Sequence, residues 1–385
     1  MDNTIKPFKV HVSDADITDL KQRSDLPRWP DQIPNTEWRY GAKTDYIQQL
    51  CDYWQHHYDW RKHEARLNQF AQFTTRIDAH DIHFIHARSK HANAVPLLIS
   101  HGWPGTIVEF LNVIDPLTNP EAHGGKAEDA FHVVCPSLPG YGFSGTTQRE
   151  QVDTLAMAEM FAELMARLGY EKYIAQGGDW GAIITSNLAI VDADHLYGIH
   201  LNMPFGYALT EDPHEGLSPQ EIDDVNAMSS FEAMETGYQK IQGTKPQTLG
   251  VGLNDSPAGL CAWITEKFYT WMDCDGDIES VLDKDELLTN ISVYWFTQSI
   301  CSSTRLYYEV TQNARLKFLE QPVTVPLGVA RYPKEVMRFP RQWCENVYTQ
   351  IVHWQDFDRG GHFAAMERPA EFLAEIRKFR ALVCD

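Results

Sequence analysis

The chain lacks an apolar run of the roughly 20 residues that a membrane span requires, and its start has neither a basic segment nor an apolar core. Its seven cysteines are scattered, without a CxxC pair or a metal-like spacing. Basic residues are scarce as well, because 33 Lys and Arg face 53 Asp and Glu, a net charge of -20. We therefore expect a cytoplasmic protein with reduced thiols, without a membrane span, that binds no nucleic acid.

Repeats, low-complexity tracts and long flexible linkers are also missing, and a hydrophobic content of 43% can supply a sizeable core. From Ile82 onward, short apolar runs alternate with helical patterns, which predicts an α/β fold with a mostly parallel sheet flanked by helices. Strands are predicted at residues 81–86, 95–100, 131–135, 172–176, 196–201, 323–329 and 351–354.

The order of these patterns indicates how the chain is organised. After Pro204 strand signals become rare and helix starts such as Ser218 and Ser256 take their place, which indicates an inserted helical lid. Strand signals then return, and a helix that begins at Pro369 closes the chain. We expect four segments. Residues 1–90 form an N-terminal extension that packs on core and lid, residues 91–205 the first part of the core, residues 206–320 the lid and residues 321–385 the second part of the core.

The most informative motif is Gly177 to Gly181, which follows the predicted strand 172–176 and precedes a helical pattern. Small residues on both sides of Asp179 allow a sharp turn that holds its side chain clear of the backbone, as in a nucleophile elbow. Serine in this place attacks acyl groups, whereas a carboxylate attacks saturated carbon and forms an alkyl ester that water must hydrolyse. The motif therefore favours an epoxide or an alkyl halide as the electrophile.

A second glycine-containing loop, His101 to Gly105, directly follows the predicted strand 95–100. Its glycines let the backbone turn beside a ligand. We expect the backbone N–H groups of Trp103 and Trp180 to form an oxyanion hole, and His101 to have a structural role.

A candidate base stands near the end of the chain. His362 lies in Gly360 to Phe363, between the last predicted strand and the terminal helix, where it can activate water. Glu335 follows the preceding strand and is the predicted acid that orients it. Asp356 and Asp358 are nearer in sequence, but they end the last predicted strand and are interpreted as turn or loop residues.

Two other patterns have a simpler interpretation. The run Asp273 to Asp277 resembles a calcium loop, but it lacks the glycine at position six and the glutamate at position twelve that an EF-hand needs, so we interpret it as an acidic turn. Histidines cluster early in the chain without a paired metal motif and are interpreted as surface or packing residues, at positions 56, 57, 63, 80, 83 and 86. No cofactor and no metal are expected.

Taken together, these motifs resemble the microsomal-type epoxide hydrolases, which are α/β-hydrolases with an N-terminal extension and a helical lid. The resemblance covers nearly the whole chain and rests on the elbow, the His101 loop and three further segments, Arg28 to Pro30, Pro136 to Ser144 and Gly360 to Ala365. It implies the α/β-hydrolase fold, with Asp179 as the nucleophile, His362 as the base and Glu335 as the acid.

The resemblance also implies two lid tyrosines that bind the epoxide oxygen and protonate it. Tyr238, upstream of the Asn254 to Pro257 segment, matches the first position. Tyr307 matches the second, with its neighbour Tyr308 as the alternative. A donor is needed there because ring opening by a carboxylate leaves an alkoxide.

The predicted function is a cofactor-independent epoxide hydrolase that acts on a small apolar epoxide and water. A hydrolytic dehalogenase is an alternative, because it uses the same Asp and His groups and can hold a halide with tryptophan N–H donors. A catalytically silent, hydrolase-like binding protein is the other alternative, although such a protein is expected to have lost part of the triad. The oligomeric state stays open, and a homodimer is compatible with the sequence.

Overall fold

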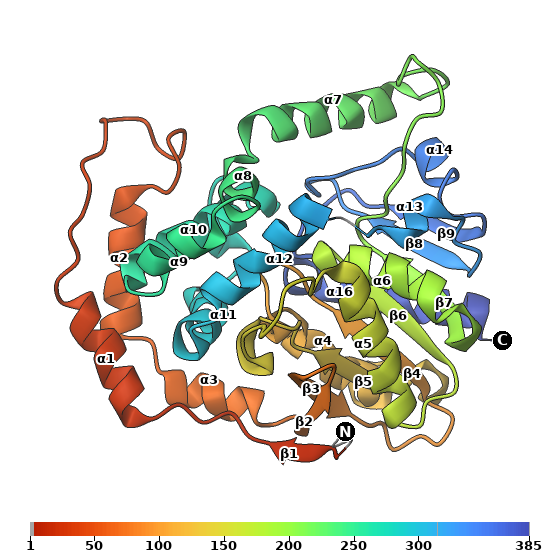
Figure 1. The fold of residues 1–385 in the computed structure, drawn as a ribbon, viewed down its shortest axis with the longest axis horizontal. Helices are drawn as coiled ribbons and strands as arrows, with labels where there is room; N and C mark the ends of the chain where they lie inside the picture. Colours follow the sequence, from red (N-terminus) through yellow and green to blue (C-terminus); the bar gives the residue numbers. More distant parts are fainter. Residues whose placement is uncertain (1–3, 314, 385) are drawn as a thin grey trace.

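The computed structural model describes residues 4–313 and 315–384, which form a nine-stranded sheet with helices around it (Figure 1). The strand order is β1-β2-β3-β5-β4-β6-β7-β8-β9, parallel from β5 onward and antiparallel at the β1 end. The strands are β1 Lys6–Phe8, β2 Gln72–Ile77, β3 His80–Ala87, β4 Val95–Ser100, β5 Phe131–Pro136, β6 Tyr173–Gly177, β7 Leu196–Leu201, β8 Leu327–Arg331 and β9 Ile351–Asp356. This arrangement confirms the predicted α/β architecture.

Two details of the sheet differ from the sequence prediction. Strands β1 and β2 were not predicted, and they extend the antiparallel end of the sheet with residues of the N-terminal segment. The strand predicted at residues 323–329 begins only at Leu327, because Pro326 has no N–H to donate to a neighbouring strand. Val323 makes only an isolated bridge with Tyr348.

Helices of the core pack against the sheet in two pairs. Helix α5 (Thr154–Arg167) packs on α6 (Trp180–Val191), and α4 (Leu111–Thr118) packs on α16 (Pro369–Val383). Helix α5 shows how sequence sets these elements, because the Asp153 side chain caps its first turn and Gly169 follows its end at a φ of +80°. The short helices α14 (Arg341–Cys344) and α15 (Ala364–Glu367) complete the second part of the core.

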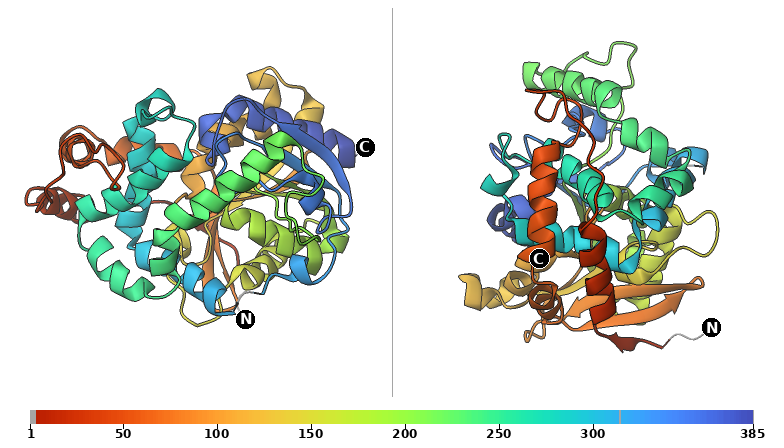
Figure 2. Two further views of the ribbon diagram at one scale, coloured as in Figure 1. Left: turned by 90° about the horizontal axis from the view of Figure 1, so that it is seen from above. Right: turned by 90° about the vertical axis from the view of Figure 1, so that its left-hand side faces the viewer.

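Residues between β7 and β8 form a helical layer beside the sheet (Figures 1 and 2). Its helices are α7 Pro219–Met234, α8 Gly237–Gln242, α9 Pro246–Leu253, α10 Pro257–Trp271, α11 Lys284–Thr297, α12 Ile300–Asn313 and α13 Lys317–Glu320. The capping box of α7, the Ser256 side-chain cap of α10 and the proline at the start of each helix lie where the sequence indicated helix starts. None of the described helices combines the length and the apolarity needed to cross a bilayer.

The N-terminal segment lies along the outer side of this lid (Figure 1). Its helices are α1 Asp14–Ser24, α2 Thr44–His56 and α3 Trp60–Leu67. Helix α2 packs against α10, and the indole of Trp54 donates a 2.9 Å hydrogen bond to Ser292 Oγ of α11. Trp38 stacks on Tyr269 of α10 with ring centroids 4.1 Å apart. These contacts join the beginning of the chain to the lid as well as to the sheet.

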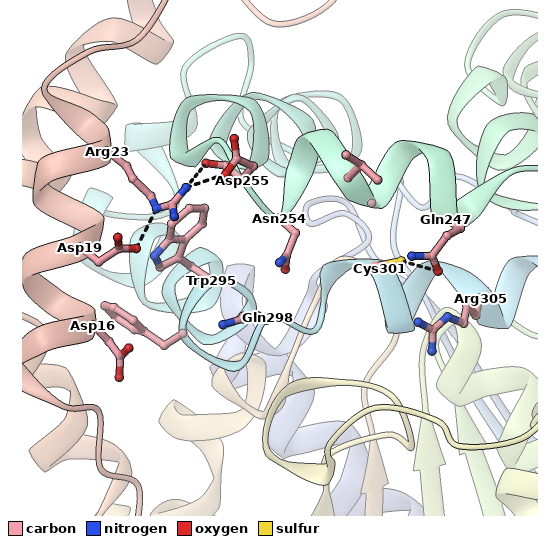
Figure 3. A pocket seen from close by; sticks show the side chains of 13 residues that line it. Asp16, Asp19, Arg23, Gln247, Asn254, Asp255, Trp295, Gln298, Cys301 and Arg305 are labelled. Carbon is pink, nitrogen blue, oxygen red and sulfur yellow. Dashed lines mark hydrogen bonds and ion pairs between the residues drawn. The ribbon is translucent and has the colours of Figure 1, made fainter.

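A surface pocket of about 410 Å³ opens between α1 and the lid helices (Figure 3). Asn254 and Gln298 lie in its middle, and Gln247 and Cys301 lie at one end. At the other end, beside Trp295, Arg23 pairs with Asp19 and Asp255, and the negative charges there outnumber its single positive charge. This pocket is separate from the residues that the sequence analysis selected, which meet at the ends of the parallel strands.

Candidate active site

Asp179 stands at the turn between β6 and α6 in a strained backbone conformation, with φ 49° and ψ -130°. The flanking glycines make this turn possible. A Cβ atom on Gly177 would lie 2.1 Å from the Gly181 carbonyl oxygen, and one on Gly181 would lie 2.1 Å from the Ser100 carbonyl oxygen. The elbow predicted from the sequence therefore depends on close contact with the end of β4.

The loop after β4 approaches the Asp179 carboxylate. The backbone N–H of Trp103 donates a 2.7 Å hydrogen bond to Asp179 Oδ1. Gly102 leaves room for this contact, because a Cβ atom there would lie 2.1 Å from the same oxygen. Trp180 is the first residue of α6, where backbone N–H groups have no partner within the helix and favour negative charge.

His101 lies behind this loop rather than in it. Its ring is buried, with Nδ1 2.9 Å from the Gly102 carbonyl oxygen, and Nε2 accepts a 3.3 Å hydrogen bond from the Leu138 N–H. Burial is the main cause that lowers the pKa of His101 to about 4, so the ring is neutral at pH 7. These contacts fix the loop that carries Trp103.

His362 lies between the two predicted carboxylates. Its Nδ1 is 2.6 Å from Glu335 Oε1, and its Nε2 is 3.4 Å from Asp179 Oδ2. Burial by itself lowers the pKa of His362, but the negative charges of Glu335 and Asp179 outweigh burial and raise this pKa well above its ordinary value. Glu335 is held in turn by the Val336 N–H, which donates to the same Oε1 at 2.8 Å.

The two alternative acids lie elsewhere. Asp356 ends β9 and faces the guanidinium groups of Arg331 and Arg338, at 3.2 and 3.7 Å. Asp358 is exposed in the loop that follows. Of these three candidate acids, Glu335 is the one that lies beside Nδ1 of His362.

The predicted lid tyrosines meet at the same place. Tyr238 on α8 and Tyr307 on α12 are 6% and 5% exposed, with ring centroids 5.8 Å apart, whereas Tyr308 is 40% exposed. Tyr238 stacks on Trp103 at 5.4 Å, and Tyr307 contacts Trp180 edge to face at 4.7 Å. Burial, with the nearby Asp179 charge, raises the pKa of both hydroxyls, which therefore stay protonated and can donate.

Hydrogen bonds tie the loop of His362 to the end of lid helix α10. The His362 N–H donates to the Trp271 carbonyl oxygen at 3.0 Å, and the Gly360 N–H donates to Asp273 Oδ2 at 2.9 Å. Glu367 accepts from the N–H groups of Phe363 and Asp273, at 2.9 and 2.8 Å. The acidic turn is therefore a structural link between the lid and the base.

Two carboxyl groups near the site were not predicted from the sequence, the buried Glu367 and the half-buried Glu109. Each lies four residues from a motif residue, after Phe363 and after Gly105 respectively, but sequence alone gives no reason to select them. Among the described residues, no three His, Cys, Asp or Glu side chains are grouped so that they could hold a metal ion.

A carboxylate on the elbow, a histidine after the last strand and an acid after the strand before it define an α/β-hydrolase with aspartate in the place of serine. Residues 5–110 match the family described as epoxide hydrolase N terminus, and residues 95–246 match the alpha/beta hydrolase fold. Epoxide hydrolase 1 of Oryctolagus cuniculus is 40% identical to the chain, over 99% of this chain and 90% of the rabbit protein.

Solved structures lead to the same assignment. The juvenile hormone epoxide hydrolase of the silkworm Bombyx mori superposes with a TM-score of 0.90 at 35% identity, covering 99% of this chain and 96% of the silkworm chain. The epoxide hydrolase of Aspergillus niger gives a TM-score of 0.88 at 32% identity, covering 99% and 97%. The chain belongs to the epoxide hydrolase family, in the group that carries this N-terminal extension.

Proposed function

We propose that the chain hydrolyses an epoxide to a vicinal diol through an ester with Asp179. The observation that carries this proposal is the setting of one carboxylate, which accepts from the Trp103 N–H through Oδ1 and lies beside His362 through Oδ2. Two buried tyrosines pack against the tryptophans next to it. The grouping of these side chains around one carboxylate supports the assignment of a nucleophile, an oxyanion donor, a base and an acid to them.

In the first step, a carboxylate oxygen of Asp179 bonds to one epoxide carbon, and the bond from that carbon to the ring oxygen breaks. The hydroxyls of Tyr238 and Tyr307 donate hydrogen bonds to the ring oxygen, and one of them gives it a proton. Asp179 needs no base for this attack, because a carboxylate is already ionised near neutral pH. The product is a hydroxyalkyl ester.

In the second step, His362 acts as the base. The negative charge of Asp179 is one cause of the raised pKa of His362, and ester formation removes that charge. The pKa of His362 therefore falls, and the ring releases its proton. This proton returns through solvent to the tyrosine that protonated the ring oxygen. Neutral His362 then takes a proton from water, whose oxygen attacks Cγ of Asp179 while Trp103 and Trp180 N–H groups hold the oxyanion. The ester bond breaks, His362 protonates the departing oxygen, and the diol leaves.

The setting of the tyrosines indicates an apolar substrate. Trp103 and Trp271 contact the ring of Tyr238, and Trp180 contacts the ring of Tyr307, so the neighbours of both rings are largely aromatic, and Gln239 is the amide that donates to the Tyr238 hydroxyl, at 2.9 Å. We infer that the substrate is a small apolar epoxide. The cytoplasmic location, the four-part division of the chain and a homodimer stay predictions from the sequence.

Product analysis tests the proposed activity. With a panel of aryl, alicyclic and long-chain epoxides, we expect the purified chain to form vicinal diols, because the two tyrosine donors fit an epoxide oxygen. Matched alkyl chlorides and bromides should release no halide above the uncatalysed rate. Halide release without diol formation would show instead that Trp103 and Trp180 hold a halide, which is the dehalogenase alternative. Neither product, with an intact fold, would favour the silent binding protein.

The tyrosines are expected to act in the first step. Tyr238→Phe and Tyr307→Phe each remove one hydroxyl and should slow ester formation by about 10²-fold, the usual scale for a positioned acid or oxyanion donor. The double variant should be nearly inactive. Rapid quenching of tryptophan fluorescence on mixing with epoxide is the measurement, because Trp103 and Trp180 lie next to the tyrosines.

Tyr308→Phe is the matched control, since Tyr308 is the next residue of the same helix but is exposed. It should leave the rate of ester formation unchanged. A large loss in Tyr308→Phe with no loss in Tyr307→Phe would show that the wrong neighbour was chosen.

A further inference from the structure

A second and much smaller cavity lies against the Asp179 carboxylate. Its volume of about 20 Å³ is enough for one water molecule. Asp179 and His362 line it together with Ser100, Glu109, Gln176 and Asn202. The polar groups of Ser100, Glu109, Gln176 and Asn202 have no part in the mechanism proposed above. The cavity places them beside Asp179 and His362, the two residues to which ester hydrolysis is assigned.

The carboxyl group of Glu109 is held in this cavity by its local backbone. Glu109 lies in the short 3-10 helix Ile107–Phe110, whose first turn is capped by the Thr106 side chain. Its side chain folds back over Gly105, where a Cβ atom would lie 1.5 Å from Glu109 Oε1. The Gly102 backbone donates a hydrogen bond to it. Any side chain at position 105 would displace this carboxyl group.

Two other polar atoms that belong to cavity residues have no partner in the described structure. Ser100 Oγ and Gln176 Oε1 are fully buried and make no hydrogen bond, although Gln176 Nε2 donates to Asn202 Oδ1 at 3.2 Å. Buried polar atoms that lack a protein partner are usually satisfied by an ordered water. These atoms lie at the carboxyl ends of β4 and β6, next to the elbow. Their unfilled hydrogen-bonding capacity favours an ordered water molecule in the cavity.

We propose that this cavity holds the water molecule that hydrolyses the Asp179 ester, and that Glu109 binds and orients it. The inference rests on the proposed function. A water in this place touches both Asp179 and His362, so its oxygen can reach Cγ while one hydrogen faces Nε2. The cavity is not lined by Tyr238 or Tyr307. The alkyl group of the ester can therefore lie beside the tyrosines while the water attacks from the cavity.

The protonation state of Glu109 suits this role. Burial is the main cause that raises the pKa of Glu109 to about 8, the Asp179 charge adds to it, and His362 and the Gly102 N–H oppose it. Mostly protonated at pH 7, the group can accept one hydrogen bond from the water and donate another. In the step itself, water loses one hydrogen to His362 and keeps the other. Glu109 neither gains nor loses a proton.

Two substitutions test the proposal. Glu109→Leu keeps a similar volume but cannot bind water, whereas Glu109→Gln keeps an acceptor and a donor. In single-turnover experiments with a good epoxide, Glu109→Leu should form the ester at the wild-type rate but hydrolyse it about 10²-fold more slowly, as expected for a lost orienting group. Glu109→Gln should restore hydrolysis to within about fivefold of wild type, because one retained hydrogen bond still orients the water.

Glu375→Leu is the matched control. Glu375 is a buried carboxyl group of the same kind, but it pairs with His353 at 2.5 Å and does not line the cavity. Glu375→Leu should change neither rate once folded protein is selected. The proposal is overturned if Glu109→Leu hydrolyses the ester as fast as wild type, or if it slows ester formation and hydrolysis equally, which is the result of a merely structural role.

A crystal structure of the wild-type protein gives a second readout that does not need a stable variant. An ordered water within hydrogen-bonding distance of Glu109 and His362 is expected, and an empty cavity at high resolution would overturn the proposal. The test is also separate from that of the proposed function. Oxygen-18 from labelled water in the first diol released, with none in Asp179, would refute the covalent route, whereas normal ester chemistry with a Glu109-independent hydrolysis rate would refute only this inference.

Discussion

Asp179→Ala is expected to lower turnover of any epoxide substrate by about 10⁴-fold or more, because the substitution removes the atom that bonds to carbon. The Trp103 N–H then loses its acceptor, and among the described residues no carboxylate other than Asp179 pairs with Nε2 of His362. We expect the fold to persist, since the Asp179 side chain is 18% exposed and belongs to the site rather than to the core. Diol formation and thermal unfolding of the same preparation measure both effects.

Asp194→Ala is the control for this substitution. Asp194 is exposed in the turn just beyond the far end of α6, the helix that Asp179 precedes. Its loss should leave activity at the wild-type level. If Asp179→Ala retained more than a few per cent of wild-type turnover, Asp179 would have no part in bond formation.

His362→Gln is expected to stop the reaction after its first step. Overall turnover should fall by about 10²- to 10⁴-fold, the range for loss of a general base, while the ester still forms. Mass spectrometry of the variant mixed with epoxide should show an adduct of the substrate's mass. In the ester Glu335 still raises the pKa of His362, and only the neutral ring accepts a proton from water, so hydrolysis of the ester in the wild type should accelerate as pH rises.

Two further variants test the assignment of the base, one in the acid that contacts His362 and one as a control. Glu335→Gln should also accumulate ester, since Glu335 contacts Nδ1 of His362 and helps the ring to carry a proton. Asp358→Ala, on an exposed residue of the loop that leads to His362, should behave as wild type. If substrate binds to His362→Gln and no adduct forms, then the histidine acts in ring opening as well.

Site residues whose positions follow from the strand ends next to them in the sequence could be predicted from the sequence. Asp179, the Trp103 loop, His362 and Glu335 each follow the end of a parallel strand, and such ends meet at one edge of a sheet. Runs of apolar residues identified these strands, so the sequence also indicated which side chains would meet. Tyr238 and Tyr307 were selected through family resemblance, because nothing local separates them from other tyrosines.

Residues whose roles depend on partners far away in the sequence could not be predicted. Strand β2 carries the buried polar residues Gln72 and Thr75, which interrupt the apolar pattern of a strand. Gln72 is satisfied by His83 Nε2 at 2.9 Å on the neighbouring strand. Similarly, Glu109 and Glu367 become significant only because the fold brings the elbow and the lid to them.

A single turnover in water enriched in oxygen-18 tests the covalent route most directly. With enzyme in excess over epoxide, the account predicts that the label enters the Asp179 carboxylate and that the first diol released is unlabelled, because its new oxygen comes from the enzyme. Digestion and mass spectrometry of the peptide that contains Asp179 locate the label. Label in the diol from this first turnover, with none in Asp179, would show direct attack of water on the epoxide and would contradict the account.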